Sequence, residues 1–368
     1  MYGVGGENVK DDVALVDVEK LRAFAFDVFK GLGVPDDDAA TCTGVLIAAD
    51  LKGFDSHGVN RLKPVYYDRV RAGLQNPVTS IKVVRKGPTT AVIDGRNGMG
   101  MVIAKRSMEM CIGKARELGM GMVAVRNSTH YGIAGYYAEM AAEKGMIGIT
   151  GTNARPSVAP TFSVENMLGT NPLTFAFPTD EAFPFCLDCA TSIIQRGKIE
   201  VYARERRMLP EGLVIGADGA YMTEADQVLA SLLKGEAALL PLGGAGEDTG
   251  GYKGYGYSTI VEILSASLQS GNYLKALTGV NLGHFFIAID VSAFTELDAF
   301  KRTTGNILRS LRAARKAPGV ERIYTAGEKE HYTSLERRER GIPLNRGVQM
   351  ELFQMRDELG LRHRFSFE

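Results

Sequence analysis

The sequence predicts a mixed α/β fold in which a central sheet is combined with helices from both ends of the chain. Three observations predict it. Residues 15–78 show only helical patterns, and the following segment to about residue 250 alternates apolar strands with amphipathic helices. Helical patterns then return towards the C-terminus. We therefore expect three regions, namely an N-terminal helical part (15–78), a central α/β domain (79–252) and a C-terminal helical part (253–368).

Helices dominate the N-terminal region. Asp17 precedes a stretch with helical periodicity, residues 18–32, and Gly33 follows as a stop signal. A second helix is expected from Asp36 to about Lys52 and a third from Arg61 to Ala72. Residues 1–12 are Gly-rich and then acidic, so we expect a loose tail and not a signal peptide.

The central region alternates between the two kinds of element. Strands are expected at 81–84, 90–94, 121–126 and 147–152, and helices at 101–118 and 134–144. Further along the chain we expect helices at 257–268, 297–316 and 348–359 and a strand at 284–290. Glycine residues and polar clusters separate these stretches, as is typical of turns.

Composition narrows the possible classes of function. The 368 residues are 45% hydrophobic and 23% charged, which is ordinary globular usage. Lys plus Arg and Asp plus Glu are both 43, and this neutral balance argues against a nucleic-acid partner. Four cysteines in this length do not form a disulfide framework and indicate a reducing compartment. No stretch approaches the ~20 apolar residues of a membrane span, so we expect a cytoplasmic protein.

His57 lies in a polar stretch between two expected helices, Asp55-Ser56-His57-Gly58-Val59. Ser56 or a nearby carboxylate could fix the tautomer of the imidazole. Arg61 follows one helical turn later, and its planar guanidinium could hold a substrate carboxylate through two hydrogen bonds. This pairing suits a hydroxy acid, because Arg binds the acid while His takes the hydroxyl proton. The alternative is a capping serine beside a surface His–Arg pair.

His130 and Asp188 are further candidates. His130 directly follows an apolar strand, and ligands gather in loops at the carboxyl ends of α/β strands. The alternative is a turn histidine bonded to backbone. Asp188 follows an apolar run and could polarise a histidine or, as its position alone favours, cap the next helix. It also interrupts the pair Cys186 and Cys189, which has no partner pair, and no ligand cluster predicts a metal.

Three glycine-rich stretches could approach phosphates. Residues 95–100 resemble a dinucleotide-binding turn but lack the third small residue and the later acidic residue. Residues 243–256 include Lys253 and open a helix, an arrangement that binds anions, but they lack the GKS/T order of a phosphate-binding P-loop. Residues 169–172 form a third turn between apolar runs. For each stretch taken singly, a tight turn is the simpler interpretation.

Eight stretches occur together in an order that is found in one protein family. They are Asp55-Ser56-His57-Gly58-Val59 with Arg61, Pro64 and Tyr67; Asp94-Gly95 with Gly98-Met99-Gly100; Asn127-Ser128-Thr129-His130-Tyr131-Gly132; Leu168-Gly169-Thr170-Asn171-Pro172; Asp188-Cys189-Ala190-Thr191-Ser192; Gly251-Tyr252-Lys253-Gly254-Tyr255-Gly256; Gly283-His284-Phe285-Phe286; and Gly327-Glu328 with Gly341-Ile342-Pro343. With these motifs the sequence resembles the type-2 malate/L-lactate dehydrogenases over nearly the whole chain.

The resemblance implies a fold unlike the Rossmann dehydrogenases. Its helical part is formed by both chain ends, so the C-terminal helices would pack with the N-terminal ones. Its central mixed-sheet domain would bind NAD or NADP. The resemblance also implies a homodimer or larger assembly and an enzyme that acts on a small 2-hydroxy or 2-keto acid.

The same resemblance implies roles for single residues. His57 matches the catalytic acid/base, supported by Ser56 and Asp188, and His130 matches a second histidine that serves as the base in some branches or lies at the nicotinamide. Arg61 matches the carboxylate-binding arginine, and Thr170 a substrate or nicotinamide contact. The positions that match cofactor-contacting segments are Ser128, His130, Asp188, Ala190, Thr191, Lys253, Gly254, Gly327 and Glu328.

The expected reaction is hydride transfer between the nicotinamide and C2 of a small 2-hydroxy or 2-keto acid. The favoured substrate pairs are malate/oxaloacetate and lactate/pyruvate. Alternatives within the family are ureidoglycolate, sulfolactate, diketogulonate and cyclic imino acid oxidoreductases. A non-catalytic nucleotide-binding protein is a weaker alternative, because a binder needs no acid–base pair. A phosphotransferase built on the Lys253 loop is disfavoured, because no Ser or Thr follows Lys253.

Overall fold

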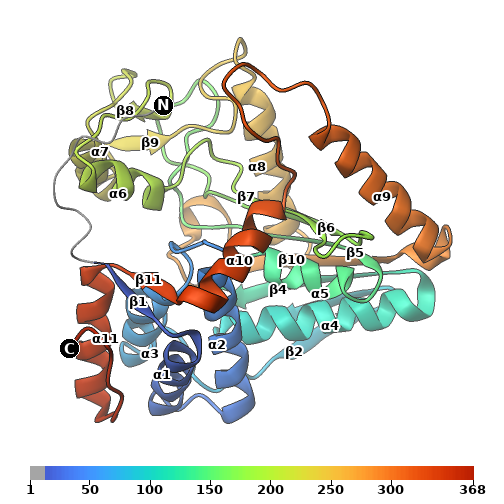
Figure 1. The fold of residues 1–368 in the computed structure, drawn as a ribbon, viewed down its shortest axis with the longest axis horizontal. Coiled ribbons are helices and arrows are strands. Elements are labelled where there is room, and N and C mark those ends of the chain that lie inside the picture. The colour runs from blue at the N-terminus through green and yellow to red at the C-terminus, as the bar shows by residue number, and fades with distance from the viewer. Residues whose placement is uncertain (1–12) are drawn as a thin grey trace. The chain divides into compact units, whose positions relative to one another are not determined.

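The chain divides into two compact units in the computed structural model, which describes residues 13–368 (Figure 1). Unit 1 contains the chain up to Val78 together with Glu328–Glu368, and unit 2 contains Thr79–Gly327. The tail expected at residues 1–12 lies outside the described residues. Mixed α/β architecture, with a mixed sheet and flanking helices, is confirmed.

The boundary near the C-terminus differs from the expected one. Residues 253–327 belong to unit 2, because strand β10 (Leu282–Asp290) pairs on both sides with strands of the central region. Only the part from Glu328 onward joins the N-terminal helices. There, strand β1 (Ala14–Val16) pairs antiparallel with β11 (Ile342–Leu344) and ties the two ends of the chain together.

Unit 1 is mainly helical. Its longer helices are α1 (Val18–Gly31), α2 (Asp36–Leu51), α10 (Glu328–Arg340) and α11 (Arg346–Leu359). The Asp17 carboxylate accepts hydrogen bonds from the backbone N–H groups of Glu19 and Lys20, so it satisfies two donors that helix α1 cannot. The apolar stripe of α1 is fully buried, as the periodicity predicts, whereas α10 was not expected from the sequence pattern.

The third expected helix, Arg61–Ala72, has three different geometries. A 3₁₀ turn (η2, Val59–Arg61) leads into a π-helical segment (η3, Leu62–Tyr67) and a short α-helix (α3, Asp68–Arg71). Pro64 lies within the π-helical segment. A proline has no N–H to donate and its ring clashes with the carbonyl one turn earlier, which disfavours regular α-helix at this point.

Unit 2 is built on a seven-stranded sheet with the strand order β2-β3-β4-β10-β5-β6-β7. The strands are β2 (Lys82–Lys86), β3 (Thr90–Asp94), β4 (Met120–Ser128), β5 (Met146–Thr152), β6 (Leu173–Phe177), β7 (Phe185–Cys189) and the central β10. Strands β3 and β4 are parallel and all other neighbours are antiparallel. Helix α4 (Gly100–Leu118) makes the crossover that a parallel pair requires.

Helices cover both faces of this sheet. Helices α4 and α5 (Gly135–Ala142) pack on one face, where Phe286 of β10 meets Tyr137 of α5 edge to face. Gly283, three residues before Phe286 on β10, has no room for a side chain because Ser265 of α8 (Gly251–Ala266) lies against it on the other face. Alternate residues of β10 therefore serve two separate cores.

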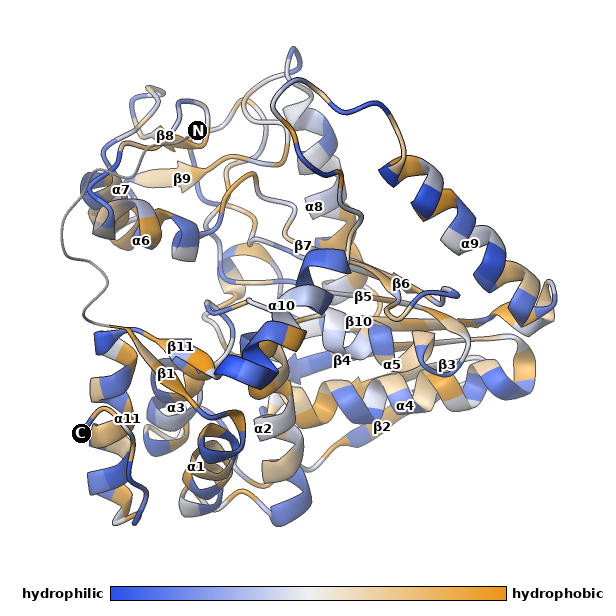
Figure 2. Cartoon of the chain, in the orientation of Figure 1, coloured by the Kyte–Doolittle hydropathy of each residue, from blue (hydrophilic) through white to orange (hydrophobic). Residues whose placement is uncertain are grey.

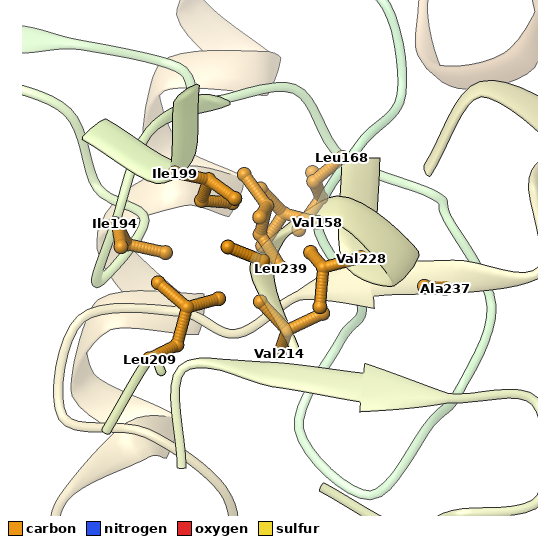
Figure 3. Packing of buried hydrophobic residues seen from close by; sticks show 10 residues of the cluster. Val158, Leu168, Ile194, Ile199, Leu209, Val214, Val228, Ala237 and Leu239 are labelled. Carbon is orange, nitrogen blue, oxygen red and sulfur yellow. The ribbon is translucent and has the colours of Figure 1, made fainter. Parts of the chain in front are cut away.

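A small lobe completes unit 2. It contains α6 (Arg196–Arg204), α7 (Ala225–Lys234) and the antiparallel pair β8 (Val214–Gly216) and β9 (Ala237–Leu239), around a compact apolar cluster (Figure 3). Helix α9 (Leu297–Arg312) follows β10 and is amphipathic, with both hydrophilic and hydrophobic residues along its length (Figure 2). Among residues 13–368, no helix is both long and apolar enough to cross a membrane.

We expect the Phe286→Ala substitution to destabilise unit 2. Phe286 is fully buried and packs against Tyr131, Tyr137 and His284, so truncation leaves a cavity that costs about 3–5 kcal/mol of unfolding free energy. Urea unfolding followed by circular dichroism measures this loss. The matched control is Phe294→Ala, because Phe294 is 79% exposed and its loss should cost less than ~0.5 kcal/mol. Equal stability of the two variants would contradict the packing described.

Candidate active site

His57 lies in the short loop between α2 and η2. Its backbone N–H donates to the Phe54 carbonyl at 2.8 Å, which closes a tight turn. The Ser56 hydroxyl lies 2.9 Å from Nδ1 of His57, so the serine holds one edge of the imidazole ring. Burial, and to a smaller extent the nearby charge of Arg61, lowers the pKa of His57 to about 4. The imidazole is therefore neutral at neutral pH and can accept a proton.

Arg61 folds back onto the same loop. Its Nε donates to the Ser56 carbonyl at 2.6 Å, which places the guanidinium beside the Ser56–His57 pair. The two terminal nitrogens make no hydrogen bond to any residue in the range 13–368. Since a planar guanidinium can offer these two donors together, they are available for one carboxylate.

Asp50 supports the loop, and the sequence reasoning missed it. Its carboxylate, buried at the end of α2, accepts the Val59 backbone N–H at 2.9 Å. Burial raises the pKa of Asp50 to about 8, against the opposing effect of that hydrogen bond. A Cβ on Gly58 would lie only 1.7 Å from Oδ1 of Asp50. The glycine after His57 is the one sequence signal of this close approach.

His130 follows strand β4, as expected from the sequence. Its Nδ1 accepts the backbone N–H of Gly132 at 3.3 Å. The adjacent Thr129 hydroxyl accepts the N–H of Gly100 and donates to the carbonyl of Gly98, both at 2.9 Å. The loop that carries His130 is thus attached to the start of α4. Ser128, the last residue of β4, is fully buried and its hydroxyl has no partner among the described residues.

The glycine-rich loop at residues 95–100 uses its own backbone donors. The N–H groups of all six residues donate within unit 2, respectively to Arg126 O, Asp94 Oδ1, Asn127 O, Gly95 O, Thr79 Oγ1 and Thr129 Oγ1. A phosphate-binding turn needs such groups free to face the ligand. This loop has none to offer without breaking internal bonds, so its likeness to a dinucleotide fingerprint is superficial.

Several expected cofactor residues come together in unit 2. The Thr170 carbonyl accepts the backbone N–H of Thr191 at 2.9 Å, and the carbonyl of Thr191 accepts the N–H of Leu242 at 2.8 Å. Gly254 packs directly against the Leu242 backbone, where a Cβ would lie 2.2 Å from the carbonyl oxygen. Residues from four distant segments, around Thr170, Thr191, Leu242 and Gly254, therefore lie close together. Ala190 belongs to this group because it precedes Thr191.

Helix α8 begins within this neighbourhood. Gly250 precedes it with φ +82°, and no side chain caps its first turn. Lys253 lies in that turn and is exposed. The Lys253 N–H donates to the Gly250 carbonyl at 2.9 Å, but a first turn that no side chain caps, together with a lysine side chain, still attracts anions such as phosphates.

Asp188 lies inside strand β7. One carboxylate oxygen accepts the N–H of Gly135 at 2.7 Å and the other accepts the Thr174 hydroxyl at 2.9 Å. The Asp188 carboxylate therefore lies at the start of α5, which precedes β7 in the chain. Its position in the sequence predicts instead that it caps the helix that follows. Cys186 and Cys189 on the same strand are free thiols, and their spacing of three places them on opposite faces.

Gly327 ends unit 2 with φ +91°, and a Cβ there would lie 2.7 Å from the Pro184 carbonyl. Glu328, which starts α10, is buried. The expected site residues therefore form two groups. Ser56, His57, Arg61 and Glu328 belong to unit 1, and the others belong to unit 2. Within residues 13–368, no cluster of His, Cys, Asp and Glu could hold a metal ion.

Comparisons with known proteins agree with these observations. The family model for malate/L-lactate dehydrogenase matches residues 16–352. A malate dehydrogenase of Pyrococcus horikoshii is 44% identical over 96% of this chain and 98% of its own length. An L-sulfolactate dehydrogenase of Methanocaldococcus jannaschii is 38% identical over 93% and 96%. The crystal structure of a malate dehydrogenase from Entamoeba histolytica matches with a TM-score of 0.93 and 43% identity, over 95% of this chain and 99% of that one.

The fold and these matches define an oxidoreductase that acts on a small 2-hydroxy or 2-keto acid with a nicotinamide cofactor. The chain belongs to the malate/L-lactate dehydrogenase family. The resemblance inferred from the motifs, and the class of reaction that it implied, are therefore confirmed.

We expect the Gly58→Ala substitution to impair the His57 loop. The new methyl group would overlap the Asp50 carboxylate, so the loop must shift, at a cost of about 1–3 kcal/mol. Turnover should fall at least about ten-fold, and thermal unfolding should begin at a lower temperature. The control is Gly113→Ala in α4, where the added Cβ meets nothing within 4 Å. A fully active Gly58→Ala enzyme would contradict this account of the loop.

Proposed function

We propose that this protein is an NAD(P)-dependent dehydrogenase that interconverts malate and oxaloacetate, with other small 2-hydroxy acids as secondary substrates. The observation that carries the proposal is the Ser56–His57–Arg61 arrangement. It offers a neutral imidazole next to a guanidinium whose two terminal nitrogens are available. The 44% identity to a protein named malate dehydrogenase supports malate as the first substrate.

The proposed mechanism assigns one task to each residue. Arg61 binds the substrate carboxylate through its terminal nitrogens and thereby orients C2. Neutral His57 takes the hydroxyl proton at Nε2 in the tautomer whose Nδ1–H donates to the Ser56 hydroxyl oxygen. A bound nicotinamide would supply the hydride acceptor for C2 in oxidation and the hydride donor in reduction. In reduction, His57 must first acquire the proton that it then gives to the keto oxygen.

The residues of unit 2 fit a dinucleotide. We assign its phosphates to the uncapped start of α8 with Lys253 and Gly254. Thr170, Ala190 and Thr191 adjoin this helix start through the backbone contacts described above. The unpartnered Ser128 hydroxyl is a further donor or acceptor for the cofactor. Since the donors of the loop 95–100 are already used, these assignments amount to a non-Rossmann cofactor site that takes NAD or NADP.

The remaining assignments follow the family resemblance. His130 is proposed as a nicotinamide-side residue, or as the base in place of His57. Asp188 is proposed to support the catalytic group and to contact the cofactor, and Gly327 and Glu328 to contact the cofactor. A homodimer or larger assembly follows from the same resemblance, and four free thiols support a reducing compartment such as the cytoplasm.

A sulfolactate substrate is the second candidate. The relative named L-sulfolactate dehydrogenase is 38% identical over nearly the whole chain. Sulfolactate and malate share the 2-hydroxy acid group that Arg61 and His57 would handle, and they differ in the second anionic group.

We expect purified protein to oxidise NADH or NADPH when oxaloacetate is supplied, with weaker or no turnover of pyruvate. The decrease in absorbance of the reduced nicotinamide measures this. The His57→Ala variant should bind the cofactor normally but lose about a hundred-fold to ten-thousand-fold in turnover, because the acid/base group is gone.

The control for that variant is His331→Ala, which removes an imidazole outside the proposed site. Full turnover by His57→Ala would transfer the acid/base role to His130. Absence of cofactor binding in the unmodified protein would contradict the proposed function as a whole.

The pH dependence of malate oxidation should report the lowered pKa of His57. The neutral imidazole is the competent base, so kcat/KM should stay constant from neutral pH downward and fall only as pH approaches about 4. Initial rates at low malate concentration over a pH series measure this. An inflection near the usual imidazole value of about 6.5 would favour a different base.

A further inference from the structure

Helix α10 contacts the His57 loop through two residues on one of its faces. Thr333 packs over Gly53, where its methyl carbon lies 3.2 Å from the position of a Cβ. Arg337, one helical turn later, donates through Nη1 to the Asp50 carbonyl at 2.5 Å. Both terminal nitrogens of Arg337 also donate to the carboxylate of Asp55, with Nη2 at 3.1 Å from Oδ2.

The polar contacts of Arg337 link α10 specifically to the loop. The helix is strongly hydrophilic (Figure 2). Its large apolar side chains, Tyr332 and Leu335, are 46% and 53% exposed and so provide little anchoring. The Arg337 side chain, in contrast, is only 15% exposed. A guanidinium that binds both oxygens of one carboxylate fixes direction as well as distance.

The contacts of Arg337 lie directly before the proposed catalytic pair. Asp55 adjoins Ser56, whose hydroxyl holds the imidazole of His57 and whose carbonyl holds Arg61. At the other end of the loop, the Asp50 carboxylate holds the Val59 N–H. Displacement of Asp55 would therefore move Ser56 and, through it, both groups that are proposed to touch the substrate.

The Arg337–Asp55 ion pair should matter more for the geometry of the His57 loop than for the free energy of unfolding. Asp55 is 55% exposed, and ion pairs with an exposed partner contribute little to global stability. Catalysis is far more sensitive, because a displacement of about 1 Å far from the chemistry can reduce the rate about a hundred-fold.

We propose that Arg337 is a positioning residue for the reaction, which fixes the Ser56–His57 loop through Asp55 and the Asp50 carbonyl. The proposal rests on the proposed function, in which His57 is the acid/base.

The test compares Arg337→Gln with Arg340→Gln. Arg340 is on the same helix, its side chain is 69% exposed, and among residues 13–368 it forms an ion pair only with Glu336. With saturating cofactor and oxaloacetate, Arg337→Gln should lower kcat about ten-fold to a hundred-fold and change the KM for the cofactor less than about two-fold. Arg337→Lys should recover only part of kcat, because an ammonium cannot bind the carboxylate at two points. Arg340→Gln should behave as the unmodified enzyme.

Hydrogen exchange followed by mass spectrometry provides a readout besides activity. Peptides that cover residues 50–61 should exchange faster in Arg337→Gln than in Arg340→Gln, while peptides from unit 2 remain unchanged. Asp55→Asn combined with Arg337→Gln should lose little more activity than Arg337→Gln alone, because both changes break one contact.

Unchanged kcat or unchanged exchange in Arg337→Gln would overturn the proposal. Additive losses in the double variant would also overturn it. Failure of the acid/base assignment on which this proposal rests has a different signature, namely full turnover by His57→Ala, and failure of the proposed function as a whole would appear as absence of cofactor binding in the unmodified protein. In the former case, faster exchange in Arg337→Gln would still show that Arg337 attaches the loop to α10, but this attachment would have no role in catalysis.

Discussion

The insertion of strand β10 between β4 and β5 is the constraint on which the rest of the structure depends. This strand comes from a part of the chain more than a hundred residues away from both neighbours, yet it is hydrogen-bonded on both sides. Its alternate residues serve the core under α4 and α5 and the core under α8. Because β10 belongs to unit 2, the chain returns to unit 1 only after this strand, with the segment from Glu328, and α10 begins at that point.

Many of the elements could be predicted because each carries a local signal. The buried stripe of α1, the cap Asp17 and the glycine Gly119 after α4 define helices by chemistry that acts over a few residues. Helix α10 has no such signal, because its sequence is strongly hydrophilic overall and polar contacts attach it to the rest of unit 1. The small lobe around Leu239 was also missed, since its short strands are recognisable only once they pair.

The candidate site was predictable in part for the same reason. Ser56, His57 and Arg61 are close in sequence, so spacing alone predicted that the arginine would lie near the histidine. Asp50 and Arg337 were not accessible to that reasoning. Asp50 resembles any acidic residue near a helix end, and Arg337 lies 282 positions from the Asp55 carboxylate that it binds. The close approach of Gly58 to Asp50 requires a residue without a side chain, so its only trace in the sequence is that one glycine.

The two glycine-rich stretches show how similar sequences can have opposite uses. In the loop at 95–100, the glycines admit neighbouring backbone so closely that every N–H finds a partner within unit 2. At the start of α8, the glycines Gly251 and Gly254 are packed just as tightly, but no side chain caps the first turn and Lys253 stands exposed beside it. Electrostatic attraction for an anion depends on donors left over after folding, not on the number of glycines. This difference in remaining donors, rather than the resemblance to a fingerprint, is the reason why we propose α8, and not the loop at 95–100, for the phosphates of a dinucleotide.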